Sequence, residues 1–230
     1  STFPKSDYVL KEGRPVGLVR GLTADGFYTT DDFTYENGVY TLKEGVADVS
    51  SAVFPNYHLH NGMNERPAGQ LAYPGMAKFK DLNDDGIIND DDVDVIGDMT
   101  PVHTGGFNIN ATYKNFDLGL YFNWSYGNEI YNVNKLAALY GYKEGAVYEN
   151  KLSIVKDCYK IYDVVNGELV ALTTPEQLNA ANANAKLPLA YSENGYVSTL
   201  RIEDGSYLRL NTLTLGYTLP KSMLQKAGIS

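Results

Sequence analysis

The sequence lacks paired cysteines, long apolar runs and a recognisable signal peptide. Its single cysteine, Cys158, cannot form a disulfide within the 230-residue chain, so we expect a small buried side chain there. No apolar run is long enough for a transmembrane helix. The first residue is not methionine, and the chain ends in a short helical pattern that should lead into another strand. We therefore expect an excerpt of a longer protein.

The sequence also lacks the residue patterns of common enzymes. It contains no nucleophile elbow, phosphate loop, redox cysteine pair or recognisable acid–base pair of carboxylates. His58 and His60 could share one strand face, but no third metal ligand accompanies them. We therefore expect a protein that is not an enzyme. The formal net charge of −9 argues against a nucleic acid partner.

What the sequence does contain is a strongly patterned β-hairpin over residues 106–126, with a two-residue turn at Lys114–Asn115. Side chains alternate with period two, so one face is apolar and the other is polar or small. In an outer-membrane barrel the apolar face would meet lipid. Its residues are Phe107, Ile109, Leu118, Leu120, Phe122 and Trp124. A half-buried hairpin of a soluble sandwich shows the same alternation, so the pattern alone leaves both readings open.

An acidic loop over residues 81–92 has the spacing of a calcium-binding loop. Asp81, Asn83 and Asp85 would supply side-chain oxygens, Ile87 its backbone carbonyl, and Asp92 would close the site. The final position is usually Glu, so Asp92 offers a shorter arm. An acidic turn held by its own hydrogen bonds is the alternative. We favour Ca²⁺ because this stretch holds many carboxylates and no basic residue, and these repel one another without a cation.

Further elements are predicted on either side of a long insert at residues 127–205. The strand over residues 206–219 changes its apolar phase between Leu210 and Leu213, which indicates a β-bulge near Asn211–Thr212. Within the insert, helical spacing predicts helices over residues 129–140 and 175–186, the second capped by Thr174. Residues 220–230 are expected to form a short helix.

Several blocks in this order and spacing resemble the SusC/RagA family of TonB-dependent outer-membrane transporters. The blocks are residues 12–17, 25–28, 79–92, 96–97, 101, 106–108, 116–118, 126–128, 130–132 and 202–220. The resemblance implies a mainly β fold: antiparallel strands of a partial transmembrane β-barrel with long extracellular loops and a few short helices. It further implies import of glycans or peptides across the outer membrane of a Gram-negative bacterium, with energy from TonB and a SusD-like surface lipoprotein as lid. The plug and the TonB-contacting region of the family have no counterpart in this chain.

On this reading residues 1–230 form part of one barrel domain. Residues 1–105 are strands and an extracellular loop, 106–126 the barrel hairpin, 127–205 a long extracellular loop, 206–219 a barrel strand and 220–230 a periplasmic turn. The orientation follows because short turns of such barrels face the periplasm and long loops face outward. Millimolar extracellular Ca²⁺ would then reach the acidic loop.

A secreted, calcium-stabilised glycan-binding module is the alternative function. The 19 tyrosines would suit sugar stacking on its loops as well as they suit a barrel. The two readings differ in what covers the apolar face of the 106–126 hairpin. A soluble module must cover that face with a second sheet, whereas a barrel buries it in lipid.

Overall fold

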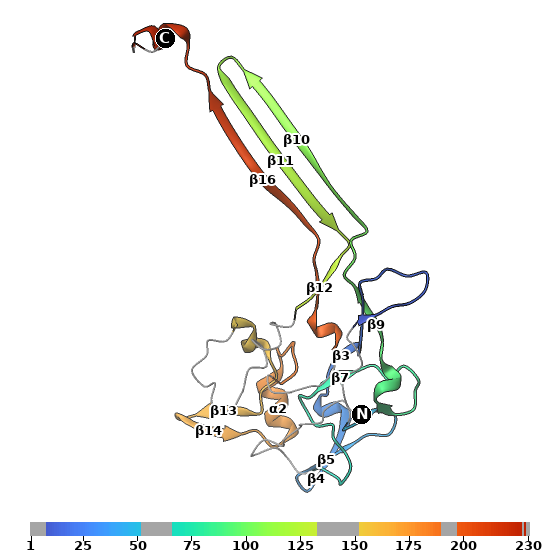
Figure 1. Ribbon diagram of the computed structural model, residues 1–230. Helices are drawn as coiled ribbons and strands as arrows, with labels where there is room; N and C mark the ends of the chain where they lie inside the picture. Colours follow the sequence, from blue (N-terminus) through green and yellow to red (C-terminus); the bar gives the residue numbers. More distant parts are fainter. Residues whose placement is uncertain (1–7, 52–65, 133–151, 190–196, 227, 229–230) are drawn as a thin grey trace. The chain divides into compact units, whose positions relative to one another are not determined.

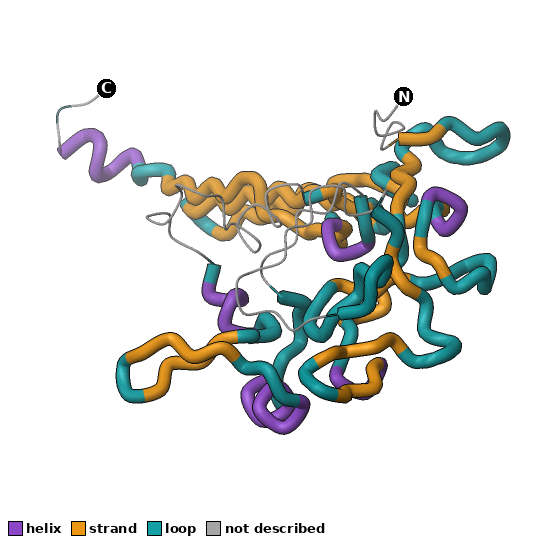
Figure 2. The backbone as a smooth tube through the Cα atoms, turned by 90° about the horizontal axis from the view of Figure 1, so that it is seen from below, coloured by secondary structure: helices purple, strands orange, loops and turns teal. Residues whose placement is uncertain are grey.

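The computed structural model describes residues 8–51, 66–132, 152–189, 197–226 and 228. The fold is mainly β, with small, mostly antiparallel sheets and few helices, which confirms the predicted class (Figures 1 and 2). The chain divides into two compact units: unit 1 is Ser1–Gly97 with Tyr131–Ile202, and unit 2 is Asp98–Ile130 with Glu203–Ser230. Within the described residues, no helix has the length and apolarity needed to cross a bilayer.

Unit 1 is built from short strand pairs joined by turns. Its sheets are β1 (Tyr8–Val9) with β2 (Leu18–Gly21) and β9 (Asp94–Asp98), β3 (Ala24–Phe27) with β7 (Ala77–Phe79), β4 (Phe33–Glu36) with β5 (Val39–Leu42), β6 (Asp48–Val49) with β8 (Ile87–Ile88), and β13 (Tyr162–Val165) with β14 (Glu168–Ala171). Its helices are η1 (Thr30–Asp32), η2 (Asp90–Asp92), η3 (Ser153–Asp157), α2 (Pro175–Asn182) and η4 (Thr199–Arg201). The β6–β8 pair is parallel, and the other paired strands with a defined register are antiparallel.

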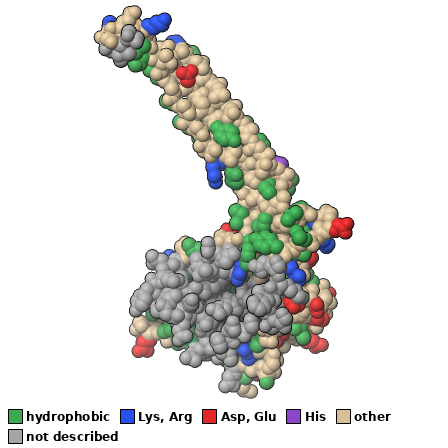
Figure 3. Space-filling model, in the orientation of Figure 1, with side chains coloured by type: hydrophobic (Ala, Val, Ile, Leu, Met, Phe, Trp, Pro, Cys, Tyr) green, Lys and Arg blue, Asp and Glu red, His purple; other side chains and the backbone are tan. Residues whose placement is uncertain are grey.

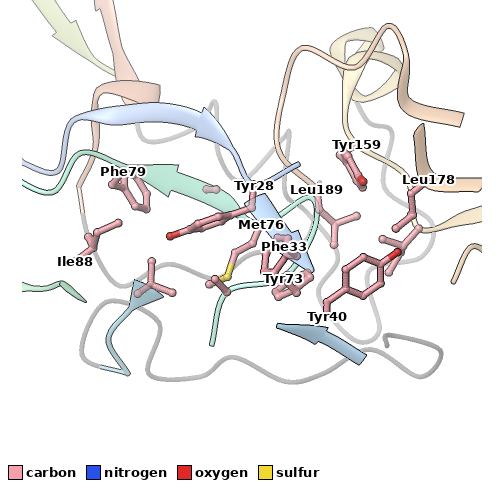
Figure 4. Close-up of a cluster of buried hydrophobic side chains, with 14 of the residues drawn as sticks. Tyr28, Phe33, Tyr40, Tyr73, Met76, Phe79, Ile88, Tyr159, Leu178 and Leu189 are labelled. Carbon is pink, nitrogen blue, oxygen red and sulfur yellow. The ribbon is translucent and has the colours of Figure 1, made fainter. Parts of the chain in front are cut away.

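An aromatic core holds unit 1 together (Figure 4). Tyr28, Phe33 and Tyr40 come from the N-terminal segment, and Tyr159 and Leu178 come from the C-terminal one; all five are buried. Burial raises the pKa of Tyr159 to about 12. The two segments of unit 1, far apart in sequence, therefore share one hydrophobic core.

Backbone hydrogen bonds join the same two segments. Leu22 N donates to Val197 O at 2.8 Å, and Thr199 N donates back to Leu22 O at 3.1 Å. Leu189 N donates to Gly75 O at 2.7 Å. A Cβ on Gly75 would lie 2.4 Å from the Tyr159 ring, so only glycine allows this close approach. The predicted long insert is thus partly folded onto the N-terminal half of the chain.

The predicted helices of the insert have different outcomes. Helix α2 begins at Pro175 with Thr174 as its N-cap, as expected, and ends at Asn182, four residues early. The helix expected over residues 129–140 is wrong at its start, because Glu129–Tyr131 is strand β12, paired with β15 (Ile202–Asp204). Residues 133–140 lie outside the described residues. Short-range helical spacing cannot exclude a strand when a pairing partner is available.

Unit 2 is dominated by a three-stranded antiparallel sheet in the order β10–β11–β16. Its strands are β10 (His103–Tyr113), β11 (Phe116–Tyr126) and β16 (Tyr207–Tyr217), each 11 residues long. Lys114–Asn115 forms the two-residue turn between β10 and β11. The short helix α3 (Lys221–Lys226) follows β16, as predicted for this segment.

An ion pair connects η1 to β7 in unit 1. Lys78 Nζ lies 2.8 Å from Asp32 Oδ1, and Thr29 N donates to Asp32 Oδ2 at 2.7 Å. Partial burial acts to raise the pKa of Asp32, but these hydrogen bonds and the Lys78 charge outweigh burial and hold the pKa below its ordinary value. The folded state is therefore stabilised when Asp32 is ionised.

Replacing Asp32 with Asn should remove this pH-dependent stabilisation. Because the folded pKa is lowered, the contribution is present above the unfolded pKa of about 4 and is lost as pH falls through the folded pKa. We expect Asp32→Asn to lower the free energy of unfolding, measured in urea at pH 7, by roughly 1 kcal/mol. The difference in unfolding free energy between the variant and the wild type should shrink below pH 4. A gap that is independent of pH would contradict this role of the ion pair.

Candidate functional site

The acidic loop follows strand β7 and has the backbone of a tight multiple turn. Asp84 and Gly86 both have positive φ, at 57° and 84°. Nothing lies within 4 Å of a Cβ built on Gly86, so glycine serves the backbone conformation there rather than a close contact. After Gly86 the chain enters β8, which pairs with β6 and so anchors the second half of the loop to unit 1.

The first three predicted ligands are brought together. Asp81 Oδ1 and Asn83 Oδ1 both accept from Asp85 N, at 3.3 and 3.1 Å. Asp81 Oδ2 accepts from Gly86 N at 2.7 Å. Asn83 Nδ2 donates to Asp85 Oδ2 at 3.0 Å, and Asp85 Oδ1 accepts from Ile87 N at 2.8 Å. These side chains therefore converge, and they also bind the loop's own backbone.

Asp92 closes the loop from the inside. It is fully buried, and its two oxygens accept from Leu82 N at 2.7 Å and from Asn89 N at 2.8 Å. The Ile87 carbonyl accepts from Asn89 Nδ2 at 3.1 Å, while the Ile87 side chain is exposed. The sequence motif indicated Asp92 as a metal ligand but did not reveal this backbone-binding role. The clue was available, because Asn89 and Asp92 have the spacing of a capping box.

The donor set suits a hard cation only if neutral oxygens take part. Among the described residues, no three Asp, Glu, His or Cys side chains lie close enough to hold a metal by themselves. The Asn83 amide and the Ile87 carbonyl would have to complete the coordination, and oxygen donors of this kind suit Ca²⁺. A carboxylate oxygen that accepts one N–H retains a further lone pair, so the hydrogen bonds leave coordinating capacity.

The other candidates from the sequence are the two histidines and the single cysteine. His58 and His60 lie outside the described residues. Cys158 is buried as expected, and burial, with a smaller effect from Asp157, raises the pKa of its thiol. A thiol of raised pKa is a poor nucleophile at neutral pH.

The three-stranded sheet of unit 2 separates apolar from polar side chains. The predicted hairpin register is confirmed, with Phe107 opposite Phe122, Ile109 opposite Leu120 and Tyr113 opposite Phe116. Strand β16 extends the same face with Leu208, Leu210, Leu213, Leu215 and Tyr217. Leu208, Leu213 and Leu215 are 67%, 63% and 68% exposed. An apolar surface of this extent needs an apolar environment.

Aromatic side chains gather at both ends of this apolar face. At one end Phe116 and Tyr217 have ring centroids 4.6 Å apart. At the other end Phe107 and Phe122 stack at 4.8 Å, and Trp124 Nε1 donates to His103 Nδ1 at 3.0 Å. His103 was not recognised in the sequence, although it is in phase with Phe107 on the alternating pattern.

A β-bulge keeps β16 in phase with the sheet. The register shifts between Tyr121 and Phe122, which pair with Thr212 and Leu210, so Asn211 is the extra residue. This confirms the bulge predicted near Asn211–Thr212. Without it, Leu208 and Leu210 would lie on the face opposite to Leu213 and Leu215.

The opposite face of the sheet is polar or small. It carries Asn108, Asn110, Thr112, Asp117, Gly119, Tyr121, Asn123, Tyr207, Arg209, Thr212, Thr214 and Gly216. Thr112 donates to Asp117 at 3.1 Å. The side of this sheet seen in Figure 3 is largely tan, with isolated hydrophobic and charged side chains. The sheet therefore suits an apolar environment on one face and water on the other.

The chain is similar to curated TonB-dependent receptors of Formosa agariphila. It is 30% identical to TonB-dependent receptor P3 over 224 residues, which are 96% of this chain and 17% of that protein. It is 30% identical to TonB-dependent receptor P26 over 158 residues, which are 67% of this chain and 14% of that protein. The chain thus spans less than a fifth of the length of either relative. No protein-family model matches it.

The fold is similar to part of a solved importer. A chain in the structure of the RagAB peptide importer in the "closed-closed" state matches with a TM-score of 0.55 and 17% sequence identity. The match covers 96% of this chain and 18% of that chain. At this identity the likeness shows the fold alone.

Replacing Asp92 with Asn should weaken the acidic loop whether or not a cation binds. The amide keeps the shape of the side chain but offers one acceptor oxygen to two backbone N–H groups. We expect a loss of about 1–3 kcal/mol in the free energy of unfolding, measured in urea with EGTA present. Asp91→Asn, at an exposed neighbour, is the matched control and should change stability little. Equal losses in both variants would contradict the closing role of Asp92.

Proposed function

Because the chain belongs to the TonB-dependent receptors of the SusC/RagA type, we propose that β10, β11 and β16 form part of the barrel wall of an outer-membrane importer in a Gram-negative bacterium. The observation that supports this most is the continuous apolar face bounded by aromatic groups. Strands of 11 residues extend roughly 36 Å, or about 25 Å of membrane depth at a 45° tilt. That depth matches the apolar band of such barrels.

The proposed orientation places unit 1 outside the cell. The Lys114–Asn115 turn is short, as periplasmic turns of such barrels are. The segments of unit 1 connect to the other ends of the three strands: Gly97 precedes β10, Tyr131 follows β11 and Ile202 precedes β16. Unit 1 is then an extracellular structure assembled from two long strand connections.

We propose that the complete receptor imports peptides or oligosaccharides, draws energy through TonB and works with a SusD-like surface lipoprotein. The solved structure with a similar fold is that of a peptide importer. The long insert at residues 127–205 is the proposed contact region for the lipoprotein or the substrate. The β13–β14 hairpin offers Val164 and Leu169, paired across strands and 65% and 69% exposed. Tyr159 is buried in the core and takes no part in such a contact.

We further propose that the acidic loop binds Ca²⁺ through Asp81, Asn83, Asp85, Asp92 and the Ile87 carbonyl. The convergence of the first three side chains supports this assignment. The ion would neutralise clustered carboxylates on the extracellular side, where even a weak site would be occupied.

The secreted glycan-binding module has less support. It would need a second sheet over the apolar face of β10–β11–β16, and the described part of unit 2 contains none. The similarity to TonB-dependent receptors extends over nearly the whole chain, which favours the importer.

Arginine at Leu120 should disrupt the barrel wall, because Leu120 lies midway along the proposed lipid-facing surface. We expect a cost of roughly 2–4 kcal/mol in the folding of the full-length receptor in lipid vesicles. Arginine at Gly119, on the opposite face, is the control and should cost less. In the same vesicles, brominated lipid should quench the fluorescence of Trp124, taken as the difference from Trp124→Phe. Absence of quenching would remove the lipid assignment.

Inserting a serine directly after Asn211 should be far more harmful than deleting Asn211. The bulge absorbs one extra residue, so a second one makes residues 207–210 reverse their faces and brings Arg209 into the lipid-facing surface. Deleting Asn211 removes only the residue that the bulge absorbs, so residues 207–210 keep their faces and surface abundance of the full-length receptor should stay near wild type. A normal level of folded receptor with the insertion would show that the phase of β16 does not control folding.

Calorimetry should detect Ca²⁺ binding to residues 1–230, with a dissociation constant of about 10⁻⁴–10⁻³ M as in extracellular loops of weak affinity. The double variant Asp81→Asn/Asp85→Asn should lose the signal, and Asp91→Asn should retain it. Heat traces that are identical for all three proteins would eliminate the site.

A further inference from the structure

An arginine occupies one end of the polar face of the unit 2 sheet. Arg209 lies directly opposite Asn123, on the same face as Tyr207 and Tyr121. Its guanidinium carbon is 5.0 Å from the centre of the Tyr207 ring, a cation–π distance. The Tyr207 ring covers one face of the guanidinium, and the N–H groups at its edge stay available for hydrogen bonds.

This arginine has no acidic partner among the described residues. Asp117 is the only carboxylate on the described polar face of the three strands. It lies six positions from Asn123 along β11, which is roughly 20 Å and too far for an ion pair. Asp117 is also bonded to Thr112. The positive charge of Arg209 is therefore uncompensated on this part of the wall.

A second polar group beside Arg209 is also unsatisfied. Asn123 Oδ1 is buried and has no hydrogen-bond partner within the described part of the chain. Directly opposed residues of an antiparallel pair have Cβ atoms about 5 Å apart, so the Asn123 amide and the Arg209 guanidinium can reach one ligand group together. Buried polar atoms are normally satisfied, which indicates that a hydrogen-bond donor of another molecule binds Asn123 Oδ1.

We propose that Arg209, Tyr207 and Asn123 form a subsite for a carboxylate group of the imported oligomer. This inference rests on the proposed importer function and names the chemistry of its substrate. The guanidinium edge binds a carboxylate in a bidentate arrangement, and Asn123 Oδ1 accepts a hydrogen bond from an N–H or O–H group next to that carboxylate in the same ligand. Tyr207 fixes the guanidinium plane, so little side-chain entropy is lost on binding.

The position of the subsite suits capture from outside. Arg209 follows Leu208 in β16, and Leu208 pairs with Trp124. Trp124 belongs to the aromatic group at the end of the sheet that is remote from the Lys114–Asn115 turn. In the proposed orientation this level is the extracellular mouth, and the polar face lines the lumen. A substrate entering the barrel would meet Arg209 before the neutral Asn and Thr side chains further along the wall.

The test uses the full-length receptor in detergent with two matched ligand pairs. One pair is a Gly-Asp repeat peptide and its Gly-Asn counterpart; the other is an oligogalacturonate and its methyl ester. We expect the wild type to bind the carboxylate member of at least one pair about tenfold more tightly, and Arg209→Gln to abolish that preference. The pair that shows the preference distinguishes a peptide carboxylate from a uronate.

Two further variants keep the test decisive. Arg209→Lys retains the charge and should retain part of the preference, which separates loss of charge from loss of folding. Lys114→Gln removes a positive charge from the distant turn and should leave the preference at the wild-type level. The same preference in Arg209→Gln as in the wild type, or binding of none of the four probes, overturns the subsite. If Arg209→Gln still imports the oligomer and still prefers the carboxylate probe, only the subsite is overturned. If the wild type imports no oligomer at all, the importer function is overturned.

Discussion

The period of two along three paired strands is the constraint on which the rest of the structure depends. In β10, β11 and β16 it places aliphatic and aromatic side chains on one face and Asn, Thr, Gly and Tyr on the other. The bulge preserves this division, because it absorbs the extra residue Asn211, which would reverse the phase of a regular strand. The two faces require different surroundings, and the wall of a barrel in lipid provides both.

Unit 1 meets a different constraint, since its strands are too short to build a core locally. Its two sequence segments are separated by the β10–β11 hairpin, and residues of both share one hydrophobic core. The bonds of Leu22 to residues 197–199 and the close approach of Gly75 to Tyr159 join the segments. Two long connections thereby become one folded structure in which the acidic loop is held by β8 and by Asp92.

The sequence predicted best where periodicity and turn chemistry act locally. The hairpin register follows from alternation and a two-residue turn, and the bulge follows from the phase change between Leu210 and Leu213. The convergence of Asp81, Asn83 and Asp85 could be predicted from loop spacing, whereas the burial of Asp92 could not, because burial depends on how the loop packs in three dimensions. The core shared by Tyr28 and Leu178 was equally hidden, since contacts between distant segments leave no periodic signal. At Glu129–Tyr131 a strand partner overrode a helical pattern.

Spin labels placed along β11 of the full-length receptor in lipid would test the central claim most directly. Single cysteines at positions 118 to 123, in a variant that lacks Cys158, would be labelled and their collision rates with oxygen and with a water-soluble nickel complex measured. A lipid-facing apolar surface predicts high oxygen accessibility at Leu118, Leu120 and Phe122, and high nickel accessibility at Gly119, Tyr121 and Asn123. Equal accessibility at successive positions, or nickel access at the even-numbered ones, would contradict the account.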